Sequence, residues 1–123
     1  MDGRNATIVA PNAGGQQEVV AVPENKTFVI KRFHLANSSA NRARIRFWDA
    51  FTDSDGTDHD PDNEPVLLGD YVIEKNESRD IVSEEGLARA IGTVVARSTS
   101  AGAAPNDVTA GAVSYTHLRA HET

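Results

Sequence analysis

The stretch that decides the fold is RARIRFWDAF, residues 42–51. Apolar and charged side chains alternate along it, with Ala43, Ile45 and Phe47 falling on one face. The other face carries Arg42, Arg44, Arg46 and Trp48. Successive side chains of a β-strand point to opposite faces of a sheet, whereas a helix would scatter the arginines around its circumference. The stretch is therefore predicted to be a strand that turns its small and apolar residues toward a core.

Residue usage extends this expectation to the whole chain. Valine and isoleucine total 18 residues against 5 leucines, and β-branched side chains fit the pleated surface of a sheet better than a helix. Further extended segments bounded by turn residues are predicted at 6–10, 17–22, 27–36, 65–74, 79–82, 92–100 and 108–112. The stretch 83–90 (SEEGLARA) is expected to form at most one turn of helix. Because the connections are too short for parallel crossovers, we predict an all-β, antiparallel β-sandwich or jelly-roll-like fold of seven or eight short strands.

Length and composition limit the possible classes of protein. A chain of 123 residues is one domain by size, and its absence of cysteine excludes disulfides and thiolate chemistry. No apolar run approaches the roughly 20 residues needed to cross a bilayer. The N-terminal MDGRNATIVAPNAGG lacks the charged and apolar regions of a signal peptide, so neither a signal peptide nor a transmembrane segment is expected.

The last eleven residues, VSYTHLRAHET, are not expected to belong to the protein. They resemble one translated frame of a transposase adapter used in preparing sequencing libraries, which implies an uncultured source. We therefore interpret residues 1–112 as a single β-sandwich domain, established only to about Gly111, and residues 113–123 as a non-native tail.

The negative charge is concentrated in one loop. Residues 49–64 contain six Asp and one Glu without a Lys or Arg; removing those seven from the 18 acids leaves 11 against 12 basic residues. Alternating carboxylates in a tight loop supply the oxygen ligands that calcium prefers. The candidate calcium ligands are Asp53, Asp55, Asp58, Asp60, Asp62 and Glu64. The pattern is not an EF-hand, because Asp58 stands where that loop needs glycine. The alternative is a solvated acidic loop that keeps a sheet edge from pairing with other chains.

Catalysis and nucleic-acid binding have little support in the sequence. No spacing links Ser, His and Asp into a triad, and His34 lies in an apolar strand where a hydrogen-bonded sheet histidine is expected. The arginine-bearing strand leads directly into the acidic run, which would repel a phosphate backbone. Arg42, Arg44, Arg46 and Trp48 are therefore predicted to form a partner-binding surface for another protein, because Arg and Trp are favoured at such interfaces. No enzyme, catalytic residue or certain cofactor is expected.

Two segments resemble small all-β virion proteins of tailed phages. VPENKTFVIKRFHLANSSANRARIRFWD, residues 22–49, has their proline-led turn, K-T-x-x-I strand and alternating strand, and residues 86–112 are similar to their closing hairpin. The acidic insertion has no counterpart. The resemblance implies a capsid decoration (cement) or other accessory protein, located in the virion, often trimeric, that contacts capsid subunits. The alternative is a calcium-dependent binding module, for carbohydrate or another surface ligand, belonging to a longer secreted protein.

Overall fold

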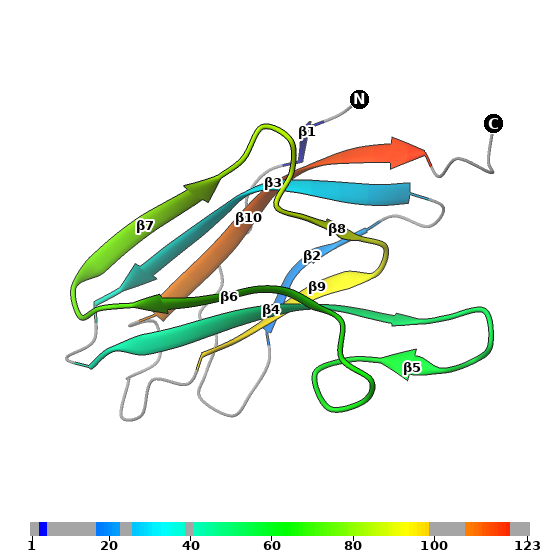
Figure 1. Ribbon diagram of the computed structural model, residues 1–123, viewed down its shortest axis with the longest axis horizontal. Coiled ribbons are helices and arrows are strands. Elements are labelled where there is room, and N and C mark those ends of the chain that lie inside the picture. The colour runs from blue at the N-terminus through cyan, green and yellow to red at the C-terminus, as the bar shows by residue number, and fades with distance from the viewer. Residues whose placement is uncertain (1–2, 5–16, 23–25, 39–40, 99–107, 119–123) are drawn as a thin grey trace.

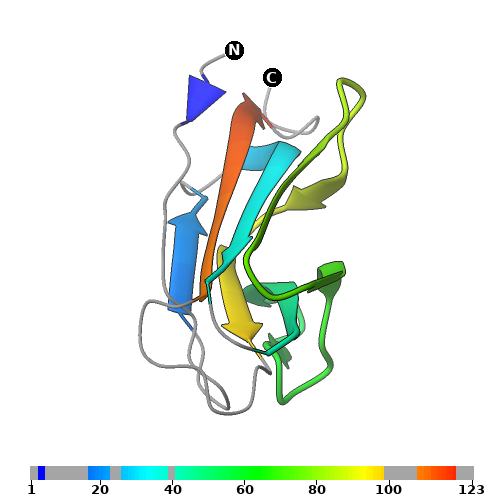
Figure 2. The same cartoon turned by 90° about the vertical axis from the view of Figure 1, so that its left-hand side faces the viewer.

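The chain folds into two antiparallel sheets packed face to face, as seen in a computed structural model that describes residues 3–4, 17–22, 26–38, 41–98 and 108–118 (Figures 1 and 2). None of these residues is helical. The strands in chain order are β1 (Gly3–Arg4), β2 (Gln17–Ala21), β3 (Lys26–Asn37), β4 (Ala43–Thr52), β5 (Asp58–His59), β6 (Leu67–Ile73), β7 (Glu77–Val82), β8 (Ala88–Ala90), β9 (Thr93–Ser98) and β10 (Val108–Leu118).

Each sheet is built around one long strand. In the β3 sheet, β3 pairs with β10 along one edge and with β7 and then β8 along the other, and β1 pairs with β10. In the β4 sheet, β4 pairs with β9 on one side and with β6 and β5 on the other, and β2 pairs with β9. The predicted antiparallel sandwich is confirmed. Leaving out the two-residue strands β1 and β5, eight of the ten strands remain, which agrees with the predicted seven or eight.

The core confirms the alternation that the sequence predicted for β4. Ala43, Ile45 and Phe47 are all fully buried, and Phe47 stacks on Phe33 of the opposite sheet with ring centroids 4.2 Å apart. The remaining large, fully buried apolar side chains of the core cluster are Phe28, Ile30, Leu35, Ile73, Val19 and Val94. Burying such a side chain contributes about 1.5–3 kcal/mol, so the two inner faces supply most of the driving force for folding.

A bulge in β3 lets a twelve-residue strand keep one face in the core. Phe28 and Ile30 are buried, but so are Phe33 and Leu35, so the buried positions change from even to odd numbers. The pairing with β10 shifts register at this point, where Val113 lies opposite Arg32 and Ser114 lies opposite Ile30. Lys31 is thus the extra residue, and without it every side chain beyond it would turn to the wrong face.

Three sequence predictions need correction or fall partly outside the description. The stretch 83–90, expected to form at most one turn of helix, forms none; it makes a turn at residues 84–85 and then strand β8, which was not predicted. The loop 52–65 is not wholly irregular, because β5 pairs back onto residues 51–52 of β4. The strand predicted at residues 6–10 lies outside the described residues.

The predicted boundary between residues 112 and 113 falls inside β10, which pairs with β3 on both sides of it. This pairing uses backbone N–H and C=O groups that every residue except proline has, so it is independent of the side chains of residues 113–118. The assignment of that segment to an adapter stays a prediction.

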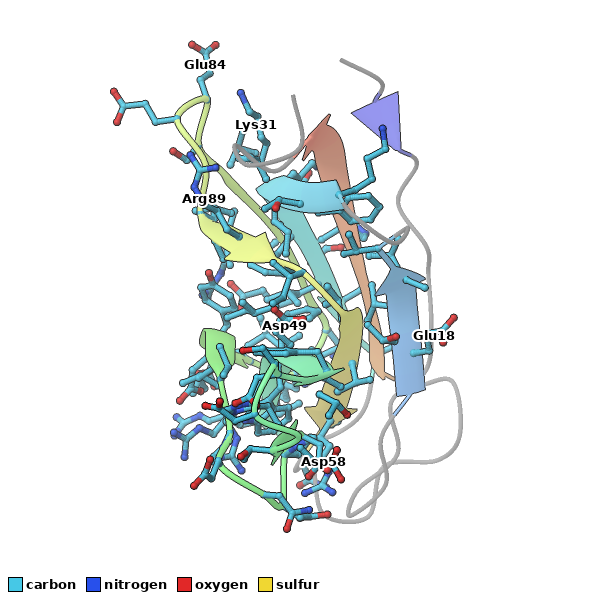
Figure 3. All side chains as sticks on the ribbon, turned by 90° about the vertical axis from the view of Figure 1, so that its right-hand side faces the viewer. Glu18, Lys31, Asp49, Asp58, Glu84 and Arg89 are labelled. Atoms are coloured by element: carbon cyan, nitrogen blue, oxygen red, sulfur yellow. The ribbon has the colours of Figure 1, made fainter. Side chains whose placement is uncertain are left out.

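The buried carboxylate of Asp49 holds the corner at which the chain passes from the β3 sheet to the β4 sheet. Ile91 and Gly92 lie between β8 and β9, and their backbone N–H groups donate to Asp49 over 2.9 and 2.8 Å. Asp49 is 2% exposed and lies in the middle of the molecule (Figure 3). Gly92 is required there, because a Cβ would overlap the carbonyl oxygen of Ala50.

We predict that Asp49→Ala lowers the free energy of unfolding by about 2–4 kcal/mol, because it leaves two partly buried N–H groups without their charged acceptor. Asp49→Asn keeps one acceptor oxygen and should lose less. Urea denaturation measures both, with Asp55→Ala as a control at an exposed aspartate. Equal stability of Asp49→Ala and the parent would show that the corner does not depend on this carboxylate.

Candidate functional site

The acidic loop is folded by donors of the chain itself. Oδ1 of Asp53 accepts hydrogen bonds from the backbone N–H groups of Asp55 (2.9 Å) and Thr57 (3.0 Å). These bonds close a turn in which Gly56 has φ +83°, a left-handed conformation that favours glycine. The turn brings β5 back against the end of β4. The loop is therefore a short hairpin and not an extended acidic run.

His59 lies at the centre of this hairpin. Its ring stacks on Phe51 with centroids 4.6 Å apart, Nε2 lies 2.8 Å from Oδ2 of Asp53, and Nδ1 lies 2.9 Å from the carbonyl oxygen of Glu64. Both partners can only accept, so the doubly protonated imidazolium satisfies both bonds. The hydrogen bond to Asp53 raises the pKa of His59 above its ordinary value of 6.5, and the same bond lowers the pKa of Asp53.

The other predicted calcium ligands have separate partners or extend into solvent. Oδ1 of Asp58 accepts from the Thr52 hydroxyl at 2.6 Å, and Asp60 accepts from the Asn63 side chain at 3.0 and 3.1 Å. Asp62 pairs with Arg97, Asp55 and Glu64 are exposed, and Glu64 has φ +38°. Within residues 41–98, which include all six acids, no three Asp, Glu or His side chains are gathered where they could hold a metal ion. Calcium binding stays a prediction and would require these hydrogen bonds to be exchanged.

The predicted arginine surface lies on the outer face of the β4 sheet. Arg42 pairs with Glu74 (3.0 Å), and Arg44 holds Asp70 with two bonds of 2.8 and 2.6 Å. Hydrogen bonding to Arg44 lowers the pKa of Asp70 and raises that of Arg44. Two exposed apolar residues of β6 lie on this face, since Val72 is opposite Arg44 and Leu67 is opposite Trp48.

The predicted role of Trp48 in a binding surface would require an exposed ring. The ring is instead covered. It is only 5% exposed, and the guanidinium carbons of Arg46 and Arg97 lie 5.2 and 5.8 Å from its ring centroid. Such cation–π contacts cover the ring from the solvent side of the sheet. Alternation correctly placed Trp48 on the outer face but did not show what covers it.

Arg97 is the residue of this site that sequence reasoning missed. The pairing of β4 with β9 sets Arg97 directly opposite Arg46, and Asp62 of the acidic loop binds Arg97 through two bonds of 3.2 and 2.9 Å. The acidic loop and the arginine strand, two separate features of the sequence, are thus one site. We name the arginine face as Arg44, Arg46 and Trp48 of β4, Arg97 of β9, and Leu67, Asp70 and Val72 of β6.

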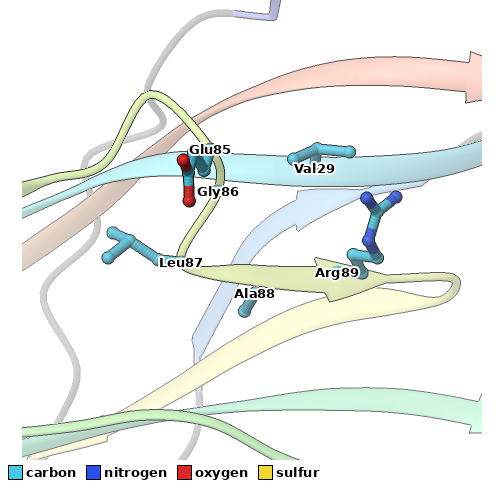
Figure 4. A pocket seen from close by; sticks show the side chains of 6 residues that line it. All are labelled: Val29, Glu85, Gly86, Leu87, Ala88 and Arg89. Carbon is cyan, nitrogen blue, oxygen red and sulfur yellow. The ribbon is translucent and has the colours of Figure 1, made fainter.

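Two other features lie on the β3 sheet, away from the arginine face. Asp80 accepts from His34 Nδ1 at 2.6 Å and from Arg32 at 2.6 and 3.1 Å, so His34 is a hydrogen-bonded sheet histidine, as expected. A depression of about 210 Å³ is lined by Val29, Glu85, Gly86, Leu87, Ala88 and Arg89 (Figure 4). Its lining residues do not include a Ser, Cys or His, the side chains that most often act as nucleophile or general base.

Comparisons with known proteins add no family assignment: no protein-family model matches this chain, and no curated protein sequence matches it. Among the described residues, no helix exists that could cross a membrane.

The His59–Asp53 pair predicts a pH dependence of stability. Because the pKa of His59 is raised on folding, its contribution is fully present below 6.5 and is lost as the pH rises through the folded pKa. Because the pKa of Asp53 is lowered, its contribution is present above 3.8 and is lost as the pH falls through the folded pKa. We expect the difference in thermal midpoint between the parent and His59→Gln to be largest between these two limits.

An NMR titration of the His59 ring protons tests directly whether the hydrogen bond to Asp53 raises the pKa of His59. The midpoint should lie above 6.5 in the parent and move down toward 6.5 in Asp53→Asn. A parent midpoint at or below 6.5 would show that the imidazolium does not hold the hairpin.

Proposed function

We propose that this chain is a non-enzymatic structural protein of a virion, which decorates or stabilises the capsid through protein–protein contacts and acts as a homo-oligomer. The observation that supports this most is the position of the arginines and the exposed apolar side chains. They lie together on the outer face of a sheet, in the arginine face. A rigid sheet suits binding to a protein surface, because its side chains are fixed before the partner arrives.

The composition of the arginine face supports the same proposal. Three arginines share this face with apolar side chains, of which Leu67 is 51% and Val72 is 42% exposed. Arginine and apolar side chains are enriched in the centre of protein interfaces, where an apolar group loses its contact with water. The ion pair of Arg44 with Asp70 fixes one guanidinium beside Val72. The resemblance to tailed-phage virion proteins adds the kind of partner.

The test is binding to a capsid protein encoded by the same source DNA, and the absence of a capsid gene beside this one would itself count against the proposal. We expect the chain to co-sediment with assembled capsids and to elute as an oligomer when light scattering measures its mass. Arg44→Glu combined with Val72→Glu should abolish capsid binding. The double variant replaces positive charge with negative charge at the interface and removes exposed apolar area from it. The matched control, Arg79→Glu with Val82→Glu on the β3 sheet, should bind normally. A monomer that does not bind the capsid would overturn the proposal.

A calcium-dependent binding module is the second candidate, favoured by one observation. A depression of about 520 Å³ in the acidic loop is lined by Thr57, Asp58, Asp62, Asn63 and Glu64, residues whose side chains carry oxygen atoms of the kind that calcium binds. Calorimetric titration with calcium separates the two candidates. We expect no saturable heat, because Asp53, Asp58, Asp60 and Asp62 are engaged in other hydrogen bonds. Saturable heat that disappears in the Asp53→Ala, Asp55→Ala double variant would favour the module.

A further inference from the structure

Arg46 and Arg97 form a like-charged pair on the arginine face. They are direct cross-strand neighbours on β4 and β9, and both guanidinium groups lie over the ring of Trp48. Like charges in this position repel each other unless an anion lies between or beside them. The Nε atoms of both side chains are buried, and neither has a hydrogen-bond partner within the described part of the chain.

The described carboxylates near this pair are shared with other groups. Asp70 lies opposite Arg46 but is held by Arg44. Asp62 is held by Arg97, whose charge also acts on Asp60. Arg46 makes no ion pair with any described residue. Asp62 is bound loosely to the site, since its side chain is 70% exposed while that of Arg97 is 23% exposed. An ion pair with one partner so open to water is weak and can be exchanged for another carboxylate at small cost.

We propose that Arg46 and Arg97 form a docking site for a carboxylate side chain of a partner protein, and that Asp62 occupies part of this site until the partner binds. The incoming carboxylate lies between the two guanidinium groups and accepts hydrogen bonds from both. Asp62 leaves Arg97 as the partner arrives. The inference rests on the proposed function only in that the arginine face contacts a protein.

The surroundings favour a carboxylate in a peptide over a phosphate or nucleic acid. Leu67 and Val72 provide exposed apolar surface beside the site for the neighbouring side chains of a peptide. The hairpin that carries Asp62 also carries the exposed Asp55 and Glu64, and these would repel a chain of phosphates. A short segment with one acidic residue between apolar ones fits the charge and the apolar surface together. Asp62 itself shows that a carboxylate can bind Arg97 with two bonds.

The experiment uses acetyl-Gly-Leu-Asp-Leu-Gly-amide as the probe and the fluorescence of Trp48, the only tryptophan of the chain, as the signal. We expect saturable binding of this peptide and none of the peptide with Asn in place of Asp. Asp62→Asn should tighten binding about fivefold, because it removes the internal competitor. Arg46→Gln should weaken binding about tenfold, and Arg46→Lys should weaken it less, because lysine keeps the charge but lacks the fork.

Matched controls lie on the β3 sheet, where Arg79 pairs with Glu77. Glu77→Gln and Arg79→Gln make the same changes of charge and should leave binding as in the parent. Far-UV circular dichroism confirms that each variant is folded. The carboxylate site is overturned if neither the parent nor Asp62→Asn binds the peptide, if Arg46→Gln binds as the parent does, or if inorganic phosphate or single-stranded DNA binds more tightly than the peptide.

Failure of the docking site can be distinguished from failure of the proposed function. A chain that binds capsids but not the peptide would refute the docking site alone. A chain that binds the peptide through Arg46 but binds no capsid would retain the site and lose the virion role.

Discussion

The stacking of Phe33 on Phe47 is the contact on which the rest of the structure depends, because it joins the central strands of the two sheets. Because Phe47 points into the core, its neighbours Arg46 and Trp48 must point to the outer face, since successive side chains in a strand point to opposite sides. The same contact fixes Phe33, and the bulge at Lys31 then allows Phe28 and Ile30 to reach the same core. The arginine face is therefore a consequence of how the core is packed, and a change of register in β4 would remove both together.

Features that depend on neighbouring residues in one strand could be predicted from the sequence, whereas features that depend on pairing between distant segments could not. The alternation of Ala43, Ile45 and Phe47 is a property of one strand, so it was predicted correctly. The bulge in β3 has a local signal as well: the consecutive polar residues Lys31 and Arg32 interrupt an apolar strand, and such a pair cannot lie on one outer face without an extra residue.

The features that escaped prediction depend on pairing between distant segments. Arg97 lies 51 residues after Arg46, and only the register of β4 with β9 makes them neighbours. The burial of Trp48 follows from that pairing, because both guanidinium groups cover its ring. The acidic loop gave a similar difficulty. Its carboxylates suggested an external cation, but the same run also contains His59. Whether the imidazole of His59 reaches Asp53 depends on the geometry of the turn between them, and counting charges in the sequence does not reveal that geometry.

The acidic loop and the arginine face together explain why so much charge is tolerated on one side of a small domain. Seven acids within sixteen residues would repel one another if the loop were extended. Folding the loop into a hairpin brings Asp53 to His59 and Asp62 to Arg97, so each cation reduces the repulsion on both the loop and the face. Arg46 differs, since the register places it opposite both Arg97 and Asp70, and the carboxylate of Asp70 is held by Arg44. Two adjacent guanidinium groups that lie over a tryptophan on paired strands have the charge and the preorganisation that binding to an acidic partner requires.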